Sequence, residues 1–351
     1  MDGHHPTSSR HRSWAGKHPK IPTSVPSHSH SWQQRHGGTR AAKRRIQGTA
    51  ERPTIHPQRF RGMLFPSGDS SREPRDWSSI MSSHTPKRRI TMRDLQARTD
   101  AGQPWSMVTA YDALTAGILE SAGVPALLVG DSAAMVVHGH DSTIPITVDE
   151  LLPMVSAVIR GTSEALVVAD LPFGSYQEGP GQALATATRF MKEAGAHAVK
   201  LEGGLSVLPQ VEALASAGIP VVGHLGLTPQ SVNLLGGYRV QGRGESGQLL
   251  MRDAKSLEAA GATAVVLEVV PEDLANQVSE VLSIPTIGIG AGPGTDAQVI
   301  VWQDLLGLTP DPAPRFVRRY ANLRDVMSEA VGQWVDDVQS RTYPAAEHSY
   351  R

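Results

Sequence analysis

Ionisable side chains lie at the ends of five successive apolar runs in the second part of the chain. In chain order they are Asp131, Asp170, Lys200 with Glu202, His224 and Glu268. If these runs are parallel strands, their carboxyl ends meet at one edge of a sheet or at one mouth of a barrel. A single charge at a strand end is often only solvated, or caps a helix. Five such ends in succession indicate an active site.

The acids of this group could hold a divalent cation. Asp131 and Asp170 follow neighbouring apolar runs, so their carboxylates can converge, and like charges repel unless a cation lies between them. Oxygen-only ligation favours Mg²⁺. Lys200 and Glu202 are two residues apart, which on a strand places them on the same face. If that face is inward, Glu202 reaches the metal directly or through water, and Lys200 offers a positive charge to an anionic substrate.

Glu268 is the candidate general base. It lies within the apolar run 265–270, the least polar surroundings of any acid in the chain. A carboxylate in such a position can accept a proton from a bound substrate. The alternative is a structural salt bridge at the barrel mouth. His224 could hydrogen-bond near the substrate or be merely structural.

Short apolar runs alternate with helix-like segments from about residue 90 onward. The runs are 105–110, 126–130, 165–171, 196–202, 220–227, 262–270 and 285–291, with a weaker eighth at 299–302. The helix-like segments are 112–122, 148–160, 180–194, 206–217, 247–260 and 271–282. Continuous apolar strands separated by helices are typical of a parallel sheet covered on both faces. Seven or eight such units over some 250 residues predict an α/β fold, the (β/α)₈ or TIM barrel.

Glycine-containing segments punctuate this pattern. Gly123, Gly195, Gly218 and Gly261 each follow a helix-like segment, where a left-handed turn would end the helix. The loop 288–294 lacks the third glycine of the dinucleotide-binding fingerprint and is interpreted as a close backbone approach over the barrel. Residues 228–244 are too long for an ordinary connector and could form a lid.

Charge divides the chain near residue 90. Residues 1–90 hold 17 Lys and Arg against 5 Asp and Glu, or +12, which leaves 16 basic and 29 acidic residues, or −13, for the remainder. We predict that residues 1–85 are a disordered basic extension rich in Ser, His and Arg, because they offer too little apolar area to fold. Residues 86–351 would form the catalytic barrel. The extension resembles a transit peptide in composition; it could also be upstream sequence ahead of a start at Met81, or a nucleic-acid-binding arm.

The chain has no cysteine, which excludes disulfides, thiolate metal sites and cysteine nucleophiles. No run approaches the roughly 18 apolar residues of a membrane span. The first 40 residues lack the apolar segment of a secretory signal. We therefore expect a cytoplasmic protein with no membrane partner and no nucleic-acid partner.

Several blocks of the chain from residue 90 onward resemble the ketopantoate (3-methyl-2-oxobutanoate) hydroxymethyltransferase family. The blocks are VGDS (129–132), GHDST (139–143), ADLPF (169–173), VKLEGG (199–204), GHLGLTPQSVN (223–233), GGYRVQGR (236–243), LE (267–268), IGIGAG (287–292) and PAAEHSY (344–350). The resemblance does not extend to residues 1–85.

This resemblance implies a reaction, a cofactor and an assembly. The reaction is hydroxymethyl transfer from 5,10-methylenetetrahydrofolate to 3-methyl-2-oxobutanoate, giving 2-dehydropantoate in pantothenate biosynthesis. It implies that Asp131 and Asp170 bind Mg²⁺ with Glu202, and that Glu268 is the proton acceptor. Asp131, Ser132, Asp170 and Lys200 would hold the oxo acid. The family also implies a homo-oligomer, often a decamer.

Two other functions compete with this one. A Mg²⁺-dependent carbon–carbon lyase of the phosphoenolpyruvate/pyruvate barrel class would use the same metal and a 2-oxo acid, but those relatives are expected to carry a cysteine in a mouth loop. A nucleic-acid-binding module rests on the basic extension alone.

Overall fold

A computed structural model describes residues 88–350 of the chain. The predictions made for residues 1–85, and the boundary proposed at residue 85, lie outside the described residues. Everything below concerns the described part.

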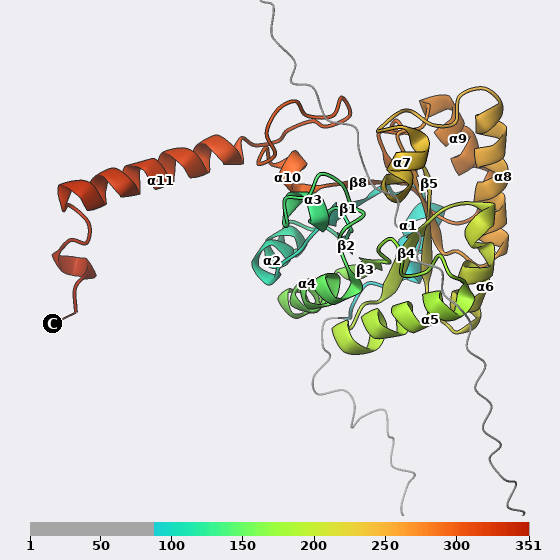
Figure 1. Cartoon of the computed structure of the whole chain (residues 1–351), viewed down its shortest axis with the longest axis horizontal. Helices are drawn as coiled ribbons and strands as arrows, with labels where there is room; N and C mark the ends of the chain where they lie inside the picture. Colours follow the sequence, from blue (N-terminus) through green and yellow to red (C-terminus); the bar gives the residue numbers. More distant parts are fainter. Residues whose placement is uncertain (1–87, 351) are drawn as a thin grey trace, which may run out of the picture. The chain divides into compact units, whose positions relative to one another are not determined.

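Eight parallel strands form a closed barrel in the order β1 to β8, with β8 pairing back to β1 (Figure 1). The strands are β1 Trp105–Thr109, β2 Ala126–Val129, β3 Leu166–Asp170, β4 Ala198–Glu202, β5 Val221–Gly226, β6 Ala264–Glu268, β7 Thr286–Ile289 and β8 Ala297–Ile300. The predicted (β/α)₈ barrel is therefore confirmed.

Helices precede, separate and follow the strands. They are α1 Met92–Asp100, α2 Ala113–Ser121, α3 Ala133–Val136, α4 Val148–Gly161, α5 Pro180–Arg189, α6 Leu208–Ser216, α7 Val232–Leu235, α8 Glu245–Ala259, α9 Glu272–Val281 and α10 Trp302–Leu305, and the last is α11 Leu323–Ser340, which does not cover the barrel. The structure also contains a short π-helix, η1 Phe190–Ala194, and the 3-10 helices η2 Leu205–Val207, η3 Pro229–Ser231 and η4 Ala346–His348. Side chains cap the N-termini of several α-helices. Thr147, for example, caps α4 and exchanges hydrogen bonds with Glu150.

The core has two layers because side chains alternate along each strand. On β2, Leu127 and Val129 pack toward the surrounding helices, whereas Ala126 and Leu128 fill the barrel interior. The other strands repeat this alternation. The same parity decides which polar side chains at the strand ends point into the barrel mouth.

Most predicted elements are present, with differences at the C-terminal end. The eighth strand is Ala297–Ile300, two residues earlier than predicted, because its pairing with β1 begins at Trp105 and Ala297. The sequence analysis did not predict α11, a helix of 18 residues of which none is buried. All four helix-ending glycines have positive φ, as predicted.

His197, at the start of β4, gives the barrel a pH-dependent contact. Its Nδ1 accepts a hydrogen bond from the Val167 backbone N–H at 3.0 Å, which requires the neutral ring. Burial, and then the charge of Arg89, lower the pKa of His197 from 6.5 to about 4. The unfolded chain therefore binds the proton more readily than the folded chain between these two values.

We expect acid to destabilise the barrel partly through this residue. Its contribution to stability is complete above pH 6.5 and is lost as the pH falls toward 4. In His197→Asn the amide oxygen can still accept from Val167 without titrating. The melting temperature of this variant should fall less steeply than that of the wild type between pH 6.5 and pH 4. Parallel curves would contradict the assignment.

Candidate active site

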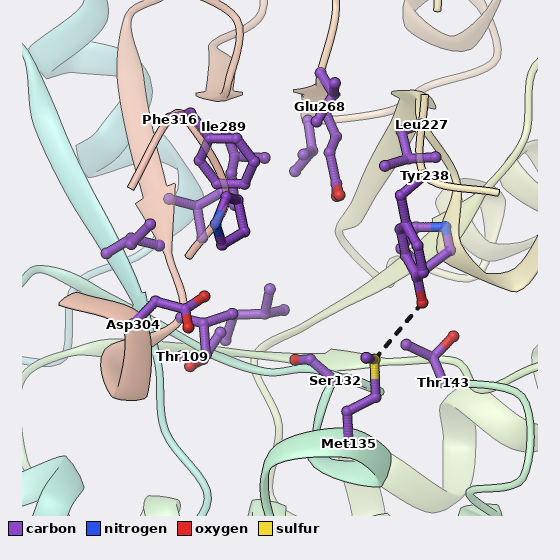
Figure 2. A pocket seen from close by; sticks show the side chains of 18 of the residues that line it. Thr109, Ser132, Met135, Thr143, Leu227, Tyr238, Glu268, Ile289, Asp304 and Phe316 are labelled. Atoms are coloured by element: carbon purple, nitrogen blue, oxygen red, sulfur yellow. Dashed lines mark hydrogen bonds between the residues drawn. The ribbon is translucent and has the colours of Figure 1, made fainter. Parts of the chain in front are cut away.

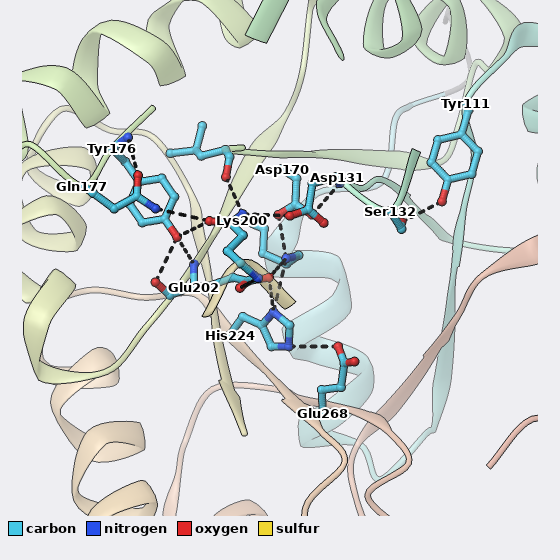
Figure 3. A network of polar contacts seen from close by, with 12 residues as sticks. Tyr111, Asp131, Ser132, Asp170, Tyr176, Gln177, Lys200, Glu202, His224 and Glu268 are labelled. Atoms are coloured by element: carbon cyan, nitrogen blue, oxygen red, sulfur yellow. Dashed lines mark hydrogen bonds and ion pairs between the residues drawn. The ribbon is translucent and has the colours of Figure 1, made fainter. Parts of the chain in front are cut away.

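Strand parity brings the predicted site residues to one mouth of the barrel (Figure 3). Val168 on β3 and Ala198 on β4 point into the barrel, so Asp170, Lys200 and Glu202, which share their parity, point the same way. His224 follows Val222 on β5 by two residues, and Glu268 follows Val266 on β6 by two. Asp131 comes just after β2 and is buried beside them. The prediction of convergence at the strand ends is confirmed.

Lys200 is the buried cation of this cluster. Its Nζ lies 2.6 Å from Asp170 Oδ1 and 3.9 Å from Glu202 Oε1. Burial alone would lower the pKa of Lys200, but Asp170, Glu202 and Asp131 together raise it above its ordinary value. The lysine is therefore charged, and it offers a fixed positive charge at the floor of the mouth.

The three buried carboxylates differ in their affinity for protons. Burial first, then the charges of Asp170 and Glu202, hold the pKa of Asp131 well above its usual range. Burial also raises the pKa of Asp170, with Lys200 opposing it. For Glu202 burial acts in the same direction, but His224 and Lys200 outweigh it and lower the pKa. Asp131 and Asp170 thus hold a proton more readily than ordinary carboxyl groups, because one lysine does not fully offset the effects of burial and of the neighbouring acids.

His224 lies between two carboxylates and is therefore part of the site itself. Its Nδ1 is 3.2 Å from Glu202 Oε1, and its Nε2 is 3.2 Å from Glu268 Oε2. Burial, the largest influence, lowers its pKa, as does Lys200, yet the two carboxylates together raise the pKa to about 9. The imidazole is thus held protonated as a link between Glu268 and the buried cluster.

Glu268 is the most exposed acid of the group. Its side chain is 18% exposed, against 2% for Asp170 and for Glu202, because it faces the open part of the mouth. The next residue, Val269, has a φ of +49°, which is strained for a β-branched side chain. Its N–H donates to Ile289 O at 2.8 Å. This fixed turn ends β6 and holds Glu268 at the rim.

Gln230 and Tyr176 belong to the site but were not singled out from the sequence. Gln230 Nε2 donates to Asp131 Oδ2 at 2.9 Å, and its backbone N–H donates to Glu202 Oε2 at 3.0 Å. The Tyr176 hydroxyl lies 2.7 Å from Gln230 Oε1. Gln230 sits inside the segment 223–233 that carries the family resemblance, but a neutral amide gives no signal of its own. The two residues orient the carboxylates.

Ser132 lies at the start of α3, beside the acids. Its Oγ is 2.8 Å from the Tyr111 hydroxyl, and the backbone N–H of Asp131 donates to Asp170 Oδ2 at 3.1 Å. Burial raises the pKa of Tyr111 above its ordinary range, so the tyrosine remains a neutral hydrogen-bonding group. The predicted substrate-binding residues Asp131, Ser132, Asp170 and Lys200 are therefore close neighbours.

A cavity of about 660 Å³ opens above this cluster (Figure 2). The polar residues of the cluster that line its floor are Asp131, Ser132, Asp170, Lys200, Glu202 and His224. Its outer walls are mostly apolar and aromatic, with Leu227, Ile289 and Phe316 on them, and Tyr238 from the predicted lid segment. The close approach predicted for the loop 288–294 is present, because a side chain at Gly290 would meet the Phe316 ring at 2.9 Å.

The donor set at the floor fits a magnesium ion. Asp170 Oδ1 and Glu202 Oε1 are buried and form ion pairs with Lys200 and His224 but no aligned hydrogen bond, so they have lone pairs with which to bind a cation or its waters. Among residues 88–350 no three His, Asp or Glu side chains form a complete cage. Mg²⁺ does not need one, since it is usually held by one or two carboxylates, water and substrate. Its charge would also offset the high proton affinity of Asp131 and Asp170.

The fold and site together define a (β/α)₈-barrel enzyme whose chemistry takes place at the carboxyl ends of its strands. A model of the family described as ketopantoate hydroxymethyltransferase matches residues 89–346. The chain belongs to the ketopantoate hydroxymethyltransferase family.

Relatives with assigned names support the same placement. A 3-methyl-2-oxobutanoate hydroxymethyltransferase of Frankia casuarinae is 63% identical over 262 residues, which cover 75% of this chain and 88% of that protein. The enzyme of the same name from Thermobifida fusca is 59% identical over 280 residues, 77% of this chain and 100% of that protein.

Solved structures share the architecture at low identity. A phosphonopyruvate hydrolase superposes with a TM-score of 0.50 at 14% identity, covering 75% of this chain and 92% of the other. A phosphoenolpyruvate phosphomutase from Streptomyces platensis subsp. rosaceus gives 0.50 at 17% identity, with the same coverage. At this identity the likeness concerns the fold alone.

Proposed function

We propose that this protein transfers a hydroxymethyl group from 5,10-methylenetetrahydrofolate to 3-methyl-2-oxobutanoate. With one water, the products are 2-dehydropantoate and tetrahydrofolate, as in pantothenate biosynthesis. The observation that carries the proposal is the cluster at the cavity floor, where Lys200 lies among three buried carboxylates and Glu268 stands above them. The names of the relatives agree with it.

The floor is suited to a small 2-oxo acid. We assign Asp131, Ser132, Asp170 and Lys200 to binding it, and Asp131, Asp170 and Glu202 to holding Mg²⁺. When bound, Mg²⁺ supplies Lewis acidity toward the carboxylate and carbonyl oxygens of the acid. Lys200 contributes a fixed charge where negative charge develops in the enolate.

The proton at C3 of the oxo acid passes to Glu268. This carboxylate is the most exposed acid of the cluster that lines the cavity, and it lies 3.2 Å from His224. The His224 imidazole at this distance keeps the orientation of the Glu268 carboxylate. The enolate carbon then forms a bond to the methylene carbon of the folate as one carbon–nitrogen bond breaks, and the oxygen of water replaces the second nitrogen as the hydroxyl group. The C3 proton, by way of Glu268, and the remaining proton of water go to the two folate nitrogens, which gives tetrahydrofolate.

No observation specifically favours the alternative function, a carbon–carbon lyase. The barrels that resemble this one at 14–17% identity share only its fold, and one fold supports many reactions. The absence of cysteine leaves such a lyase without the acid expected in its mouth loop.

An assay of the complete reaction tests the proposal. The protein should turn over 3-methyl-2-oxobutanoate with methylenetetrahydrofolate only in the presence of a divalent cation. In Asp131→Asn and Asp170→Asn the shape is kept and one ligand charge is lost, so the Mg²⁺ concentration needed for half-maximal rate should rise, and excess Mg²⁺ should partly restore the rate. Normal activity of both variants after metal stripping would contradict the metal assignment.

We also propose that the protein is a homo-oligomer, a decamer by family resemblance. The described residues include apolar side chains on α11 that nothing covers, such as Val331 at 57% and Trp334 at 53% exposure. An exposed apolar helix face of this kind is typical of an interface.

No described helix is long and apolar enough to cross a membrane. The cytoplasmic location and the lack of a nucleic-acid partner stay predictions.

A further inference from the structure

Asp304 carries a carboxylate that lines the cavity without a partner in the described part of the chain. It belongs to α10, and its side chain points into the cavity beside Thr109 (Figure 2). Its position is fixed, because the backbone N–H of Trp302 donates to Thr109 Oγ1 at 3.2 Å and that of Tyr320 donates to Leu305 O at 2.8 Å. No hydrogen bond or ion pair of the carboxylate itself is present among residues 88–350.

The surroundings of Asp304 are apolar. Apolar residues that line the same cavity include Val299, Ile300, Val301, Pro314 and Phe316. When a ligand displaces water from such a wall, an unpaired carboxylate loses its hydration at a considerable cost. A ligand that fills this part of the cavity must therefore bring hydrogen-bond donors to Asp304.

Charge assigns the two substrates to different parts of the cavity. The oxo acid is an anion, so it belongs at the floor, where Lys200 provides the positive charge. Asp304 would repel it. The small acid also fills only a fraction of a cavity of about 660 Å³, a size that suits a drug-sized ligand. The outer part is left for a larger, flat and donor-bearing molecule.

We propose that Asp304 binds the amino-pyrimidine edge of the reduced pterin ring of the one-carbon donor, an inference that rests on the proposed function. This edge presents a ring N–H and an exocyclic amino group side by side, and a carboxylate can accept from both at once. The ring lies against the apolar wall at Phe316. Its opposite side, which carries the transferable carbon, then faces the floor and Glu268.

A change in the ligand tests this contact without altering the protein. Tetrahydrofolate and its 2-desamino analogue differ in one of the two donors, and their dissociation constants can be measured by calorimetry with the wild-type protein saturated with oxo acid and Mg²⁺. Because hydrogen bonds to charged groups are strong, the analogue should bind roughly 10- to 100-fold more weakly. Equal affinity for the two ligands would overturn the proposal.

The variant Asp304→Asn tests the protein side. It should lose most of the discrimination between the two ligands, because the amide cannot accept from both donors. Its kcat/KM for methylenetetrahydrofolate should fall by roughly 10- to 100-fold. Exchange of the C3 hydrogen of the oxo acid with deuterated solvent, measured without folate, should remain within about twofold of the wild type, since no folate contact is involved. Asp100→Asn, at an exposed position on α1 outside the cavity, is the matched control.

The outcomes separate this proposal from the function on which it rests. Wild-type protein without C3 exchange or turnover would contradict the proposed function. A second outcome is that the wild type exchanges and turns over normally, while Asp304→Asn loses affinity equally for tetrahydrofolate and its 2-desamino analogue. This would leave the proposed function intact and show that Asp304 only supports the fold of α10. If the variant also loses exchange, the wild-type comparison of the two ligands decides the case.

Discussion

Replacing Glu268 with Gln is expected to lower turnover by about 10²- to 10⁴-fold, the usual contribution of a general base. The amide keeps the size of the side chain and one acceptor oxygen, but it cannot take up the C3 proton. Binding of the oxo acid should change little, because Glu268 lies at the rim and the floor is formed by other residues. The effect should therefore appear in kcat rather than in the KM for the oxo acid.

Deuterium exchange isolates the step in question. Without folate, the wild type should exchange the C3 hydrogen of 3-methyl-2-oxobutanoate with solvent, and Glu268→Gln should not. Glu280→Gln, at an exposed position on α9, is the control and should exchange normally. Exchange at the wild-type rate in Glu268→Gln would move the base elsewhere, with His224 the next residue to test.

Replacing Lys200 with Met is expected to destabilise the barrel by about 3–5 kcal/mol in metal-free buffer, the range found when one partner of a buried ion pair is removed. Methionine has a similar length but no charge. It leaves the buried acids Asp131, Asp170 and Glu202 without their lysine. The free energy of unfolding, measured by urea denaturation, should report the loss directly.

Two comparisons show whether charge is the cause. Lys255→Met, at an exposed position on α8, should unfold at nearly the wild-type urea concentration. Mg²⁺ should restore part of the lost stability in Lys200→Met, since a second cation can neutralise the same carboxylates, and it should have a smaller effect on Lys255→Met. Equal denaturation midpoints for the two variants would contradict the view of Lys200 as the central charge.

The strands and the charged ends of the barrel could be predicted because each depends on a local pattern. A continuous apolar run identifies β3, and the aspartate at its end can be recognised from the sequence of this strand alone. Residues such as Lys200 and Glu202 could be assigned to one face by their spacing alone. The sequence left open whether that face points inward, and the structure shows that it does, because Ala198 of the same strand and parity fills the barrel interior.

The remaining parts depend on contacts between distant segments, which local patterns do not contain. Gln230 matters because folding brings it to Asp131, 99 residues away in the chain. The start of β8 is fixed by its pairing with β1 rather than by its own composition. α11 is a different case, since Val331, Val335 and Val338 repeat at helical spacing, so attention to that period would have found it.

The pairing of β1 with β8 also has a consequence for synthesis on the ribosome. Trp105 pairs with Ala297, 192 residues later. At about 5–20 residues per second, roughly 10 to 40 seconds separate the translation of these two strands. During that interval the nascent chain carries an unpaired β1 edge and a half-open ring of apolar strands, which can associate with other chains. We therefore expect the nascent chain to be most prone to association between the emergence of the first strand and that of the last.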